Sequence, residues 1–522
     1  MFDVLIHDGN VIDGTGNLWF RGAIGIEGNT IRILRGDVSS VDADRKIDAT
    51  GMVVCPGFID MHTHSGLMVL QDPRHEPKVR QGITTEVIGV DGNSYAPFGS
   101  TEDFDKFLLL NAGIDGKPAL PKRWLSVSDY LSLFDGSVSC NFAYFIGNAP
   151  LRIAAMGWGP GKASLEEIEA QTVLIRDGME EGAFGISTGL TYPPGSYADT
   201  DELTALCLEV NRLGGFYVTH VRYTLGDRFL DPFKEAIQIG RDSGVPVHIS
   251  HLNNATPGGA RRLLDLIDSA RNEGLDVTFD SYPYPYSSTR LVSLLPDWTQ
   301  EGGPEKILEV LNSPRGRRQL EPFLDEQAPI WDRAFVTNFK KPHNRQWDGC
   351  SLIEISGGLG KSLVDTMCDL LLEEDLGLSH VAVGGNPLNI REFFKHPAHM
   401  IGSDGLLLGD HLNPRTYGTF PMVLGDLVRE EQTLDLSQAI RKMTSFPAQR
   451  LGLEDRGVLR DFSKADIVVF DPRTVGTEAS LKDPKKMPTG IPYVIVNGRI
   501  VIDNGHHTGA LPGVALRHRI NS

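Results

Sequence analysis

An apolar segment that ends in two closely spaced histidines most constrains the fold of this chain. Residues Met52–Ile59 are mostly apolar, and the β-branched Val53 and Val54 among them are typical of a strand covered on both faces. His62 and His64 follow, and side chains two residues apart in an extended chain point the same way. Both imidazoles can therefore reach one metal ion, although a pair taken alone could equally be one packed and one solvated histidine.

The centre of the chain alternates strand-like and helix-like runs, a pattern that indicates βα units and a parallel sheet. Charged amphipathic runs predict helices at Leu165–Glu180, Asp201–Leu213 and Pro232–Ser243. No Gly-x-Gly-x-x-Gly turn follows a predicted strand, so an α/β fold with a (β/α)8 TIM-like barrel fits better than an open doubly wound sheet. The predicted strands are Val53–His62, Thr84–Val90, Phe142–Gly147, Ala183–Ser187, Phe216–His220, Val245–His251, Val277–Tyr282 and Ala398–Asp404.

Both ends of the chain have a different texture, with short β-like runs and turn signals. Ala465–Phe470 predicts one strand, and Tyr493–Ile502 predicts two that are divided by Asn497-Gly498. Strands from the two ends can pair, so we expect a small β-sandwich into which the barrel is inserted. The expected division is residues 1–54 and 451–522 for the sandwich and 55–450 for the barrel, with an insertion over the barrel mouth at about 288–339.

Composition excludes several classes of partner. The net charge of −18 and the pI of about 5.3 argue against nucleic acid or an anionic membrane, both of which require a basic face. The five cysteines are scattered without Cys-x-x-Cys spacing, so we expect no disulfide framework and a reducing cytoplasm. The start of the chain lacks the pattern of a signal peptide, and no apolar run predicts a membrane span. The sequence allows a homo-oligomer but contains no feature that demonstrates one.

Side chains suited to metal or acid–base work follow several predicted strands, on the face where (β/α)8 enzymes build active sites. Any one of them has a bland alternative as a core or turn residue, but six at matching strand ends make coincidence improbable. Imidazoles and carboxylates together favour zinc, with manganese or iron as alternatives. The six are His62 and His64 after the first strand, Asp91 after the second, His220 after the fifth, His251 after the sixth and Asp404 after the eighth.

The chemistry follows from this set of ligands. A divalent ion lowers the pKa of bound water and polarises a carbonyl group. Asp404 would take a proton from the attacking water and pass it to the leaving nitrogen. The predicted reaction is hydrolysis of an amide, a carbon–nitrogen bond of a small-molecule substrate.

At this point the sequence resembles the amidohydrolase superfamily and, within it, the N-acyl-D-amino-acid deacylases (D-aminoacylases). The similarity covers essentially the whole chain, and the motifs Gly185–Asp199 and Pro414–Phe420 are close to diagnostic of the subgroup. The motifs are Pro56–His64, Gly82–Thr85, Gly185–Asp199, Thr219–Arg222, Ile249–His251, Tyr282–Tyr284, Ser403–Gly405 and Pro414–Phe420.

The resemblance implies roles for individual residues. His220 and His251 would hold the tightly bound metal, His62 and His64 a second or weaker site, and Asp404 would be the catalytic acid/base. Arg415 would grip a substrate carboxylate. The candidate substrate-binding residues are Tyr192, Arg222, Asn253, Tyr282, Tyr284 and Arg415.

Three positions depart from the family pattern. Asp91 stands where the family usually has a metal-binding cysteine. A carboxylate can bridge two cations, so Asp91 favours a two-metal site. The alternative is that Asp91 does not bind metal and that only one ion is present. Ser65 stands where an aspartate often follows the second histidine. Asn253 replaces a lysine near the substrate carboxylate, which removes a charge-assisted hydrogen bond of about 1.5–3 kcal/mol.

Three functions therefore stay open. The first is a metal-dependent deacylase of N-acyl-D-amino acids or a related acylated amine. The second opens a cyclic amide, imide or hydantoin-like ring, or cleaves an uncharged amide, and the changes at Asp91 and Asn253 keep it open. The third is a catalytically silent barrel that acts as a binding protein; it would not need four histidines, Asp404 and Arg415.

Overall fold

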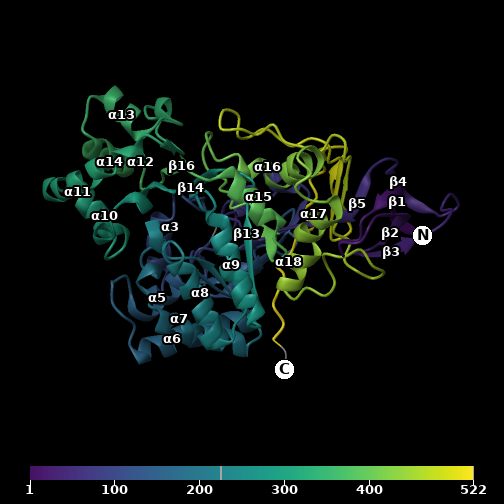
Figure 1. The fold of residues 1–522 in the computed structure, drawn as a ribbon, viewed down its shortest axis with the longest axis horizontal. Helices are drawn as coiled ribbons and strands as arrows, with labels where there is room; N and C mark the ends of the chain where they lie inside the picture. Colours follow the sequence, from purple (N-terminus) through teal and green to yellow (C-terminus); the bar gives the residue numbers. More distant parts are fainter. Residues whose placement is uncertain (121, 224–225, 521–522) are drawn as a thin grey trace.

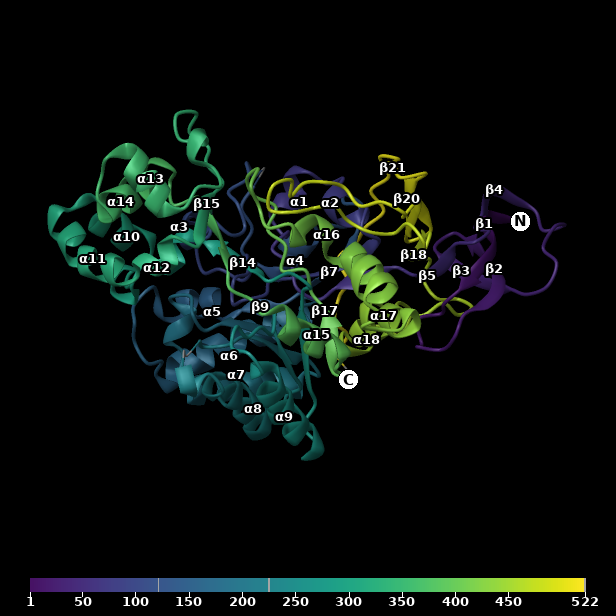
Figure 2. The ribbon, with the colours of Figure 1, turned by 45° about the horizontal axis from the view of Figure 1, so that its top comes forward.

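Strands from both ends of the chain form one sheet in the computed structural model, which describes residues 1–120, 122–223 and 226–520. Its order is β21-β20-β19-β18-β5-β1-β2-β3, with β4 beside β1. Figures 1 and 2 show it at one end of the molecule, the N-terminal strands purple and the C-terminal strands yellow. The strands are β1 (Phe2–Val11), β2 (Phe20–Glu27), β3 (Thr30–Leu34), β4 (Ala43–Asp48), β5 (Val53–Pro56), β18 (Ile467–Phe470), β19 (Tyr493–Val496), β20 (Arg499–Asp503) and β21 (His506–His507).

The central part of the chain forms two parallel sheets, with the orders β17-β13-β12-β11-β10-β9 and β6-β7-β8. Their strands are fully buried, as expected of strands that are covered on both faces. The strands are β6 (Phe58–Asp60), β7 (Ile83–Ile88), β8 (Asn141–Tyr144), β9 (Ile146–Gly147), β10 (Gly185–Gly189), β11 (Phe216–His220), β12 (Val247–Ile249), β13 (Val277–Ser281) and β17 (His399–Ile401).

Backbone hydrogen bonds join the two parallel sheets at both edges. At one edge β8 continues directly into β9, and the amide of Phe145 between them donates to Ile88 O at 3.0 Å. At the other edge the amide of Met61, just after β6, donates to Ile401 O of β17 at 3.1 Å. The ends of β6 and β17 are thereby brought together.

The predicted strand Val53–His62 is wrong in one respect, because it divides at Gly57 into β5 of the terminal sheet and β6 of a parallel sheet. A Cβ atom on Gly57 would lie 2.1 Å from Thr84 Oγ1, so only glycine lets the chain pass this close to β7. Periodicity cannot reveal this change of sheet, since both halves are buried and apolar.

Helices follow most of the parallel strands and lie outside them in Figures 1 and 2. The helix predicted at Leu165–Glu180 is confirmed as α6, which begins with a capping box between Ser164 and Glu167. None of the helices in the described ranges combines the length and apolarity that crossing a bilayer requires. The helices are α1 (Met68–Gln71), α2 (Glu76–Val79), α3 (Thr101–Leu110), α4 (Val127–Leu131), α5 (Asn148–Met156), α6, α7 (Thr200–Arg212), α8 (Asp231–Ser243), α9 (Gly259–Asn272), α15 (Pro387–Lys395), α16 (Arg415–Met422), α17 (Leu436–Met443) and α18 (Ser445–Arg450).

A separate lobe with its own apolar core packs beside the parallel strands, at the upper left of Figure 1. Its core includes Leu291, Trp331 and Met367, and its sheet has the order β14-β16-β15. The lobe comprises β14 (Tyr286–Arg290), α10 (Pro304–Asn312), α11 (Pro314–Glu326), α12 (Ala328–Trp331), β15 (Ala334–Thr337), α13 (Leu352–Leu359), α14 (Leu363–Glu373) and β16 (Ser379–Val383).

Replacing Gly89 by alanine should destabilise the junction between β7 and β9. Gly89 has φ +77°, and its Cβ would lie 2.1 Å from Phe145 O. A left-handed conformation costs an alanine about 1–2 kcal/mol, and the displaced backbone adds to this. We expect Gly89→Ala to lower the free energy of unfolding by at least about 2 kcal/mol in denaturant titrations. In the control Gly99→Ala, the new Cβ meets Ala154 at an ordinary 3.8 Å, so stability should not change; equal losses in both variants would contradict the prediction.

Candidate metal centre

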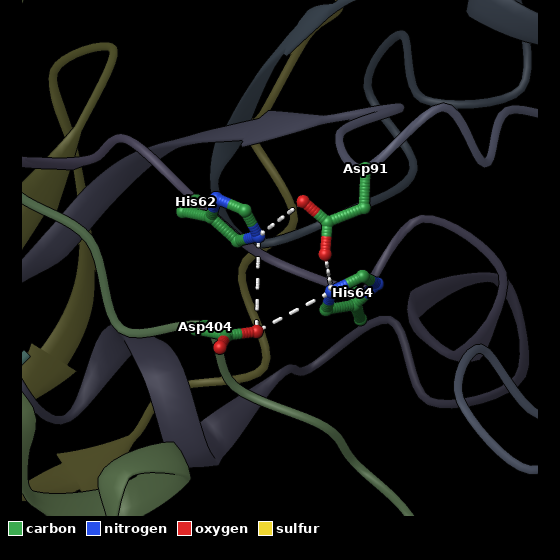
Figure 3. Close-up of side chains that lie close together, drawn as sticks. All are labelled: His62, His64, Asp91 and Asp404. Carbon is green, nitrogen blue, oxygen red and sulfur yellow. Dashed lines mark ion pairs between the residues drawn. The ribbon is translucent and has the colours of Figure 1, made fainter. Parts of the chain in front are cut away.

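Four of the predicted ligands converge from three parallel strands on one buried point (Figure 3). His62 and His64 follow β6, Asp91 follows β7, and Asp404 follows β17. His62 Nε2 lies 3.4 Å from Asp91 Oδ1 and 3.7 Å from Asp404 Oδ1. His64 Nε2 lies 3.6 Å from Asp91 Oδ2 and 3.4 Å from Asp404 Oδ1. These four side chains form the first cluster.

Asp91 also belongs to a second cluster, with His220 at the end of β11 and His251 just after β12. Its Oδ2 lies 3.5 Å from His220 Nδ1, and its Oδ1 lies 3.4 Å from His251 Nε2. The two imidazole nitrogens are 2.8 Å apart. The structure thus brings all six predicted ligands together, and Asp91 contributes both oxygen atoms to both clusters.

The atoms that face each other here have the chemistry of metal ligands. His62 Nε2, His64 Nε2 and Asp91 Oδ1 are buried and have no hydrogen-bond partner among the described residues. Polar atoms buried in this way are costly unless something else satisfies them. Imidazole nitrogens and carboxylate oxygens at this spacing suit a divalent cation such as zinc, so the residues present fit the predicted metal.

Neighbouring groups fix two of the imidazole rings. His64 Nδ1 lies 3.0 Å from Asp115 Oδ1, which leaves Nε2 directed at the first cluster. His220 Nε2 lies 2.7 Å from Thr191 Oγ1, which leaves Nδ1 directed at Asp91. Hydrogen bonds of this kind hold the tautomer and orientation of a metal-binding histidine.

Asp280 contacts residues of both clusters. Its carboxylate accepts hydrogen bonds from the amide of His251 at 3.0 Å and from His248 at 2.9 Å, and it lies 3.9 Å from His62 Nδ1. The two ring nitrogens of His248 lie 2.8 Å from Thr278 Oγ1 and 2.9 Å from Asp280 Oδ2, so this histidine belongs to neither cluster.

Sequence reasoning missed three supporting residues. Asp280 lies within a predicted strand, near its carboxyl end, so the rule that located Asp91 could have found it. Asp115 and Thr191 lie in loops, where no local pattern announces a contact with a histidine.

Opposite charges shift the pKa values of the buried groups. Burial would raise the pKa of Asp91, but His62, His251 and His220 outweigh it and the pKa falls well below its usual range. Burial would lower the pKa of His64, yet Asp115, Asp404 and Asp91 raise it. For Asp404, burial is again outweighed, chiefly by Arg415, and its pKa is lowered. Without a metal, the carboxylates are thus held in their charged form.

A cavity of about 260 Å³ opens beside the two clusters. Three of the predicted substrate residues, Tyr192, Asn253 and Tyr282, line it. Apart from the clustered ligands, its lining is neutral, and no lysine or arginine occurs among its described lining residues. The other lining residues are Ile114, Thr191, Tyr223, Ser287, Ser288, Thr289, Ser293 and Leu294.

The other three predicted substrate residues do not line this cavity. Arg222 donates to the carbonyl oxygens of Ser196 and Ala198. Tyr284 points the other way along its extended segment, toward Gly418. Arg415 is fully buried behind Tyr282 and pairs with Asp404 Oδ2 at 2.9 Å. Sequence spacing alone could not reveal these orientations.

Comparisons with known proteins show the family of this chain. The Amidohydrolase family model matches residues 45–276 and 340–502. Over 95% of this chain and 93% of the relative, the sequence is 35% identical to N-acyl-D-glutamate deacylase of Alcaligenes xylosoxydans xylosoxydans.

Solved structures resemble the whole chain. N-acyl-D-glutamate deacylase from Bordetella bronchiseptica, in complex with zinc and a phosphonate inhibitor, is 31% identical with a TM-score of 0.84, over 99% of this chain and 100% of that one. A D-aminoacylase with a binuclear metal centre is 32% identical with a TM-score of 0.83, over 99% and 100%. The chain therefore belongs to the amidohydrolase family, in the branch of the D-aminoacylases and N-acyl-D-amino-acid deacylases.

Proposed function

We propose that this protein is a metal-dependent deacylase that hydrolyses the amide bond of N-acyl-D-amino acids. The observation that carries the proposal is the shared Asp91, which joins two clusters of buried ligands beside a cavity and the paired Asp404 and Arg415. Relatives at 31–35% identity that carry deacylase names support the substrate class.

His220, His251 and Asp91 would hold one divalent ion, and His62, His64, Asp91 and Asp404 a second, with zinc as the expected metal. When bound, such an ion lowers the pKa of water and polarises a carbonyl group. Asp404 has the position of a general base, because its Oδ1 lies 3.4 Å from His64 Nε2 and 3.7 Å from His62 Nε2 in the first cluster. It accepts a proton from the attacking water and transfers it to the leaving nitrogen.

We further propose the finer architecture expected from the sequence: the two parallel sheets close into a (β/α)8 TIM-like barrel that is inserted into a β-sandwich made by both termini. The hydrogen bonds at both sheet edges support closure. We keep the division at residues 54 and 450, and extend the mouth insertion to Val383, because β16 pairs with β14 rather than with a parallel strand. Five unpaired cysteines support a reducing cytoplasm as its location.

Arg415 is the proposed partner of the substrate carboxylate. It contacts three groups at the cavity wall: the Asp404 carboxylate, the carbonyl oxygen of Ser288 and the Tyr282 ring. Its Nε and Nη1 atoms have no partner among the described residues. The second candidate function, hydrolysis of a cyclic or uncharged amide, is favoured by the neutral cavity lining and by Asn253.

A substrate screen with Arg415→Met separates these functions. The metal-loaded enzyme is assayed on N-acetyl-D-amino acids, their L-enantiomers, their uncharged amides, hydantoins and cyclic imides. We expect turnover of the D-acids, and we expect Arg415→Met to lower their kcat/KM about ten- to a hundredfold more than that of the matched amides, because a charge-assisted hydrogen bond is lost. Turnover only of cyclic or uncharged substrates would reject the deacylase proposal in favour of the second function. An equal loss on acids and amides would remove Arg415 from carboxylate binding.

Asp404→Asn should lower kcat at least about a hundredfold, because positioned acid–base catalysis contributes that much or more. The metal-to-protein ratio, measured by elemental analysis, should stay at the wild-type value, because His62, His64 and Asp91 of the same cluster remain. Asp268→Asn, at an exposed aspartate that pairs with His396, is the control and should retain full activity. Activity near wild type in the Asp404 variant would remove this residue from the mechanism.

Asp91→Ala should lower the number of ions bound per chain, since it removes the one carboxylate that both clusters share. The matched control is Asp48→Ala, in the exposed group of His7, Asp8 and Asp48. There water competes for the cation, and we expect no loss of bound metal. An unchanged ratio in the Asp91 variant would make this residue a bystander.

A further inference from the structure

A second group of charged side chains is fully buried next to the first cluster. Lys78 of α2 extends its ammonium group between Asp60 of β6 and Glu86 of β7, with Nζ 2.9 Å from Asp60 Oδ2 and 3.1 Å from Glu86 Oε1. His75 Nε2 lies 2.6 Å from the other oxygen of Glu86. None of these groups is a predicted ligand, and the Lys78 ammonium group pairs with both carboxylates.

This group is connected to the backbone on both sides of the first cluster. Asp60 Oδ1 accepts hydrogen bonds from the amide of His62 at 3.3 Å and from that of Ser403 at 2.7 Å. Lys78 Nζ donates to Ser403 Oγ at 2.7 Å. Glu86 accepts a hydrogen bond from Ser65 Oγ at 2.7 Å. Lys78 and its two carboxylates therefore contact the residues next to His62, His64 and Asp404.

The backbone at Asp404 requires such support. Asp404 has φ +50°, in the left-handed region, and a non-glycine residue persists there only where its surroundings hold it. Its amide donates to His62 O at 2.8 Å, which ties it to the strand that carries the two histidines. The next residue is Gly405, where a Cβ would lie 2.9 Å from Lys78 Nζ. The ammonium group thus packs against the turn that aims Asp404.

Stability alone does not explain the burial of these charges. Removing ions from water is expensive, and replacing a buried ion pair by apolar residues is often neutral or stabilising. A buried network does, however, specify one geometry for the groups that it connects. The network of Lys78, Asp60 and Glu86 lies between the turn at Asp404 and the strand end at His62. The geometry that it specifies is therefore the placement of Asp404 relative to His62.

We propose that Lys78 is a positioning residue: through Asp60, Ser403 and Glu86 it fixes the position of Asp404 relative to the metal-binding histidines. Because its kinetic effect is exerted through Asp404, the proposal rests on the proposed function. Misplacing a catalytic group by about 1 Å can lower turnover about a hundredfold without loss of any reacting group.

The test is Lys78→Met in the full-length, metal-loaded enzyme. We expect kcat to fall about ten- to a hundredfold, KM to change less than about threefold, and the metal content to stay unchanged. Lys442→Met is the matched control: Lys442 is also buried, but it binds the carbonyl oxygens of His396 and His399 at the other end of β17, so kcat should be retained even if stability falls.

A charge-balanced variant covers the case in which Lys78→Met, with two carboxylates left uncompensated, fails to fold. Lys78→Met/Asp60→Asn/Glu86→Gln leaves no unpaired charge and should show the same fall in kcat. Wild-type kcat in this folded, metal-loaded variant would overturn the proposal, as would a loss of activity that follows a loss of metal in proportion.

Hydrogen exchange gives a readout that needs no substrate. We expect the amides of residues 401–406 to exchange at least about tenfold faster in the Lys78 variants, with residues 277–281 of β13 unchanged as an internal reference. Unchanged exchange at 401–406 would reject the positioning role. If exchange rises as expected while the wild-type enzyme hydrolyses none of the screened substrates, the positioning role stands and the proposed function fails.

Discussion

The carboxylate of Asp91 is the constraint on which the centre of this molecule depends. It lies 3.4–3.6 Å from the nearest nitrogen of four imidazoles, which are contributed by the ends of β6, β11 and β12. Burying an isolated carboxylate would cost free energy. The four histidines, and the metal ion that they are suited to bind, offset this cost. Their contact with Asp91 requires distant strands to meet at one edge, and the parallel sheets satisfy this requirement because their carboxyl ends lie on the same side.

Support for the clusters is arranged in layers. Asp115 and Thr191 contact the outer nitrogens of His64 and His220, and Asp280 accepts a hydrogen bond from the amide of His251. Below them, Lys78 and Asp60 connect the strand ends to each other. Three of the facing atoms of the clusters, His62 Nε2, His64 Nε2 and Asp91 Oδ1, have no hydrogen-bond partner among the described residues, which is expected where the remaining partner is an ion rather than a side chain.

Much of the fold could be predicted because its signals are local. The helix at Leu165–Glu180 and the strand at Phe216–His220 have the predicted bounds, since capping residues and apolar runs mark their ends. The division at Gly57 could not be predicted, because its cause is the close approach of Thr84 from another strand. The lobe of residues 286–383 was underestimated for a similar reason: β14 and β16 are almost ninety residues apart and pair only in three dimensions.

The sequence by itself determined the ligand types and their strand-end positions, because the alternation of strand and turn places polar residues where strands finish. It also determined the family, through motifs that extend over most of the chain. Tertiary structure alone decided which side chains face each other. Asp91 is shared between two clusters, Arg415 lies behind Tyr282 against Asp404, and Lys78 sits beneath the turn at Ser403. The physical reason is that orientation and burial depend on packing between elements far apart in the chain, and no local period contains that information.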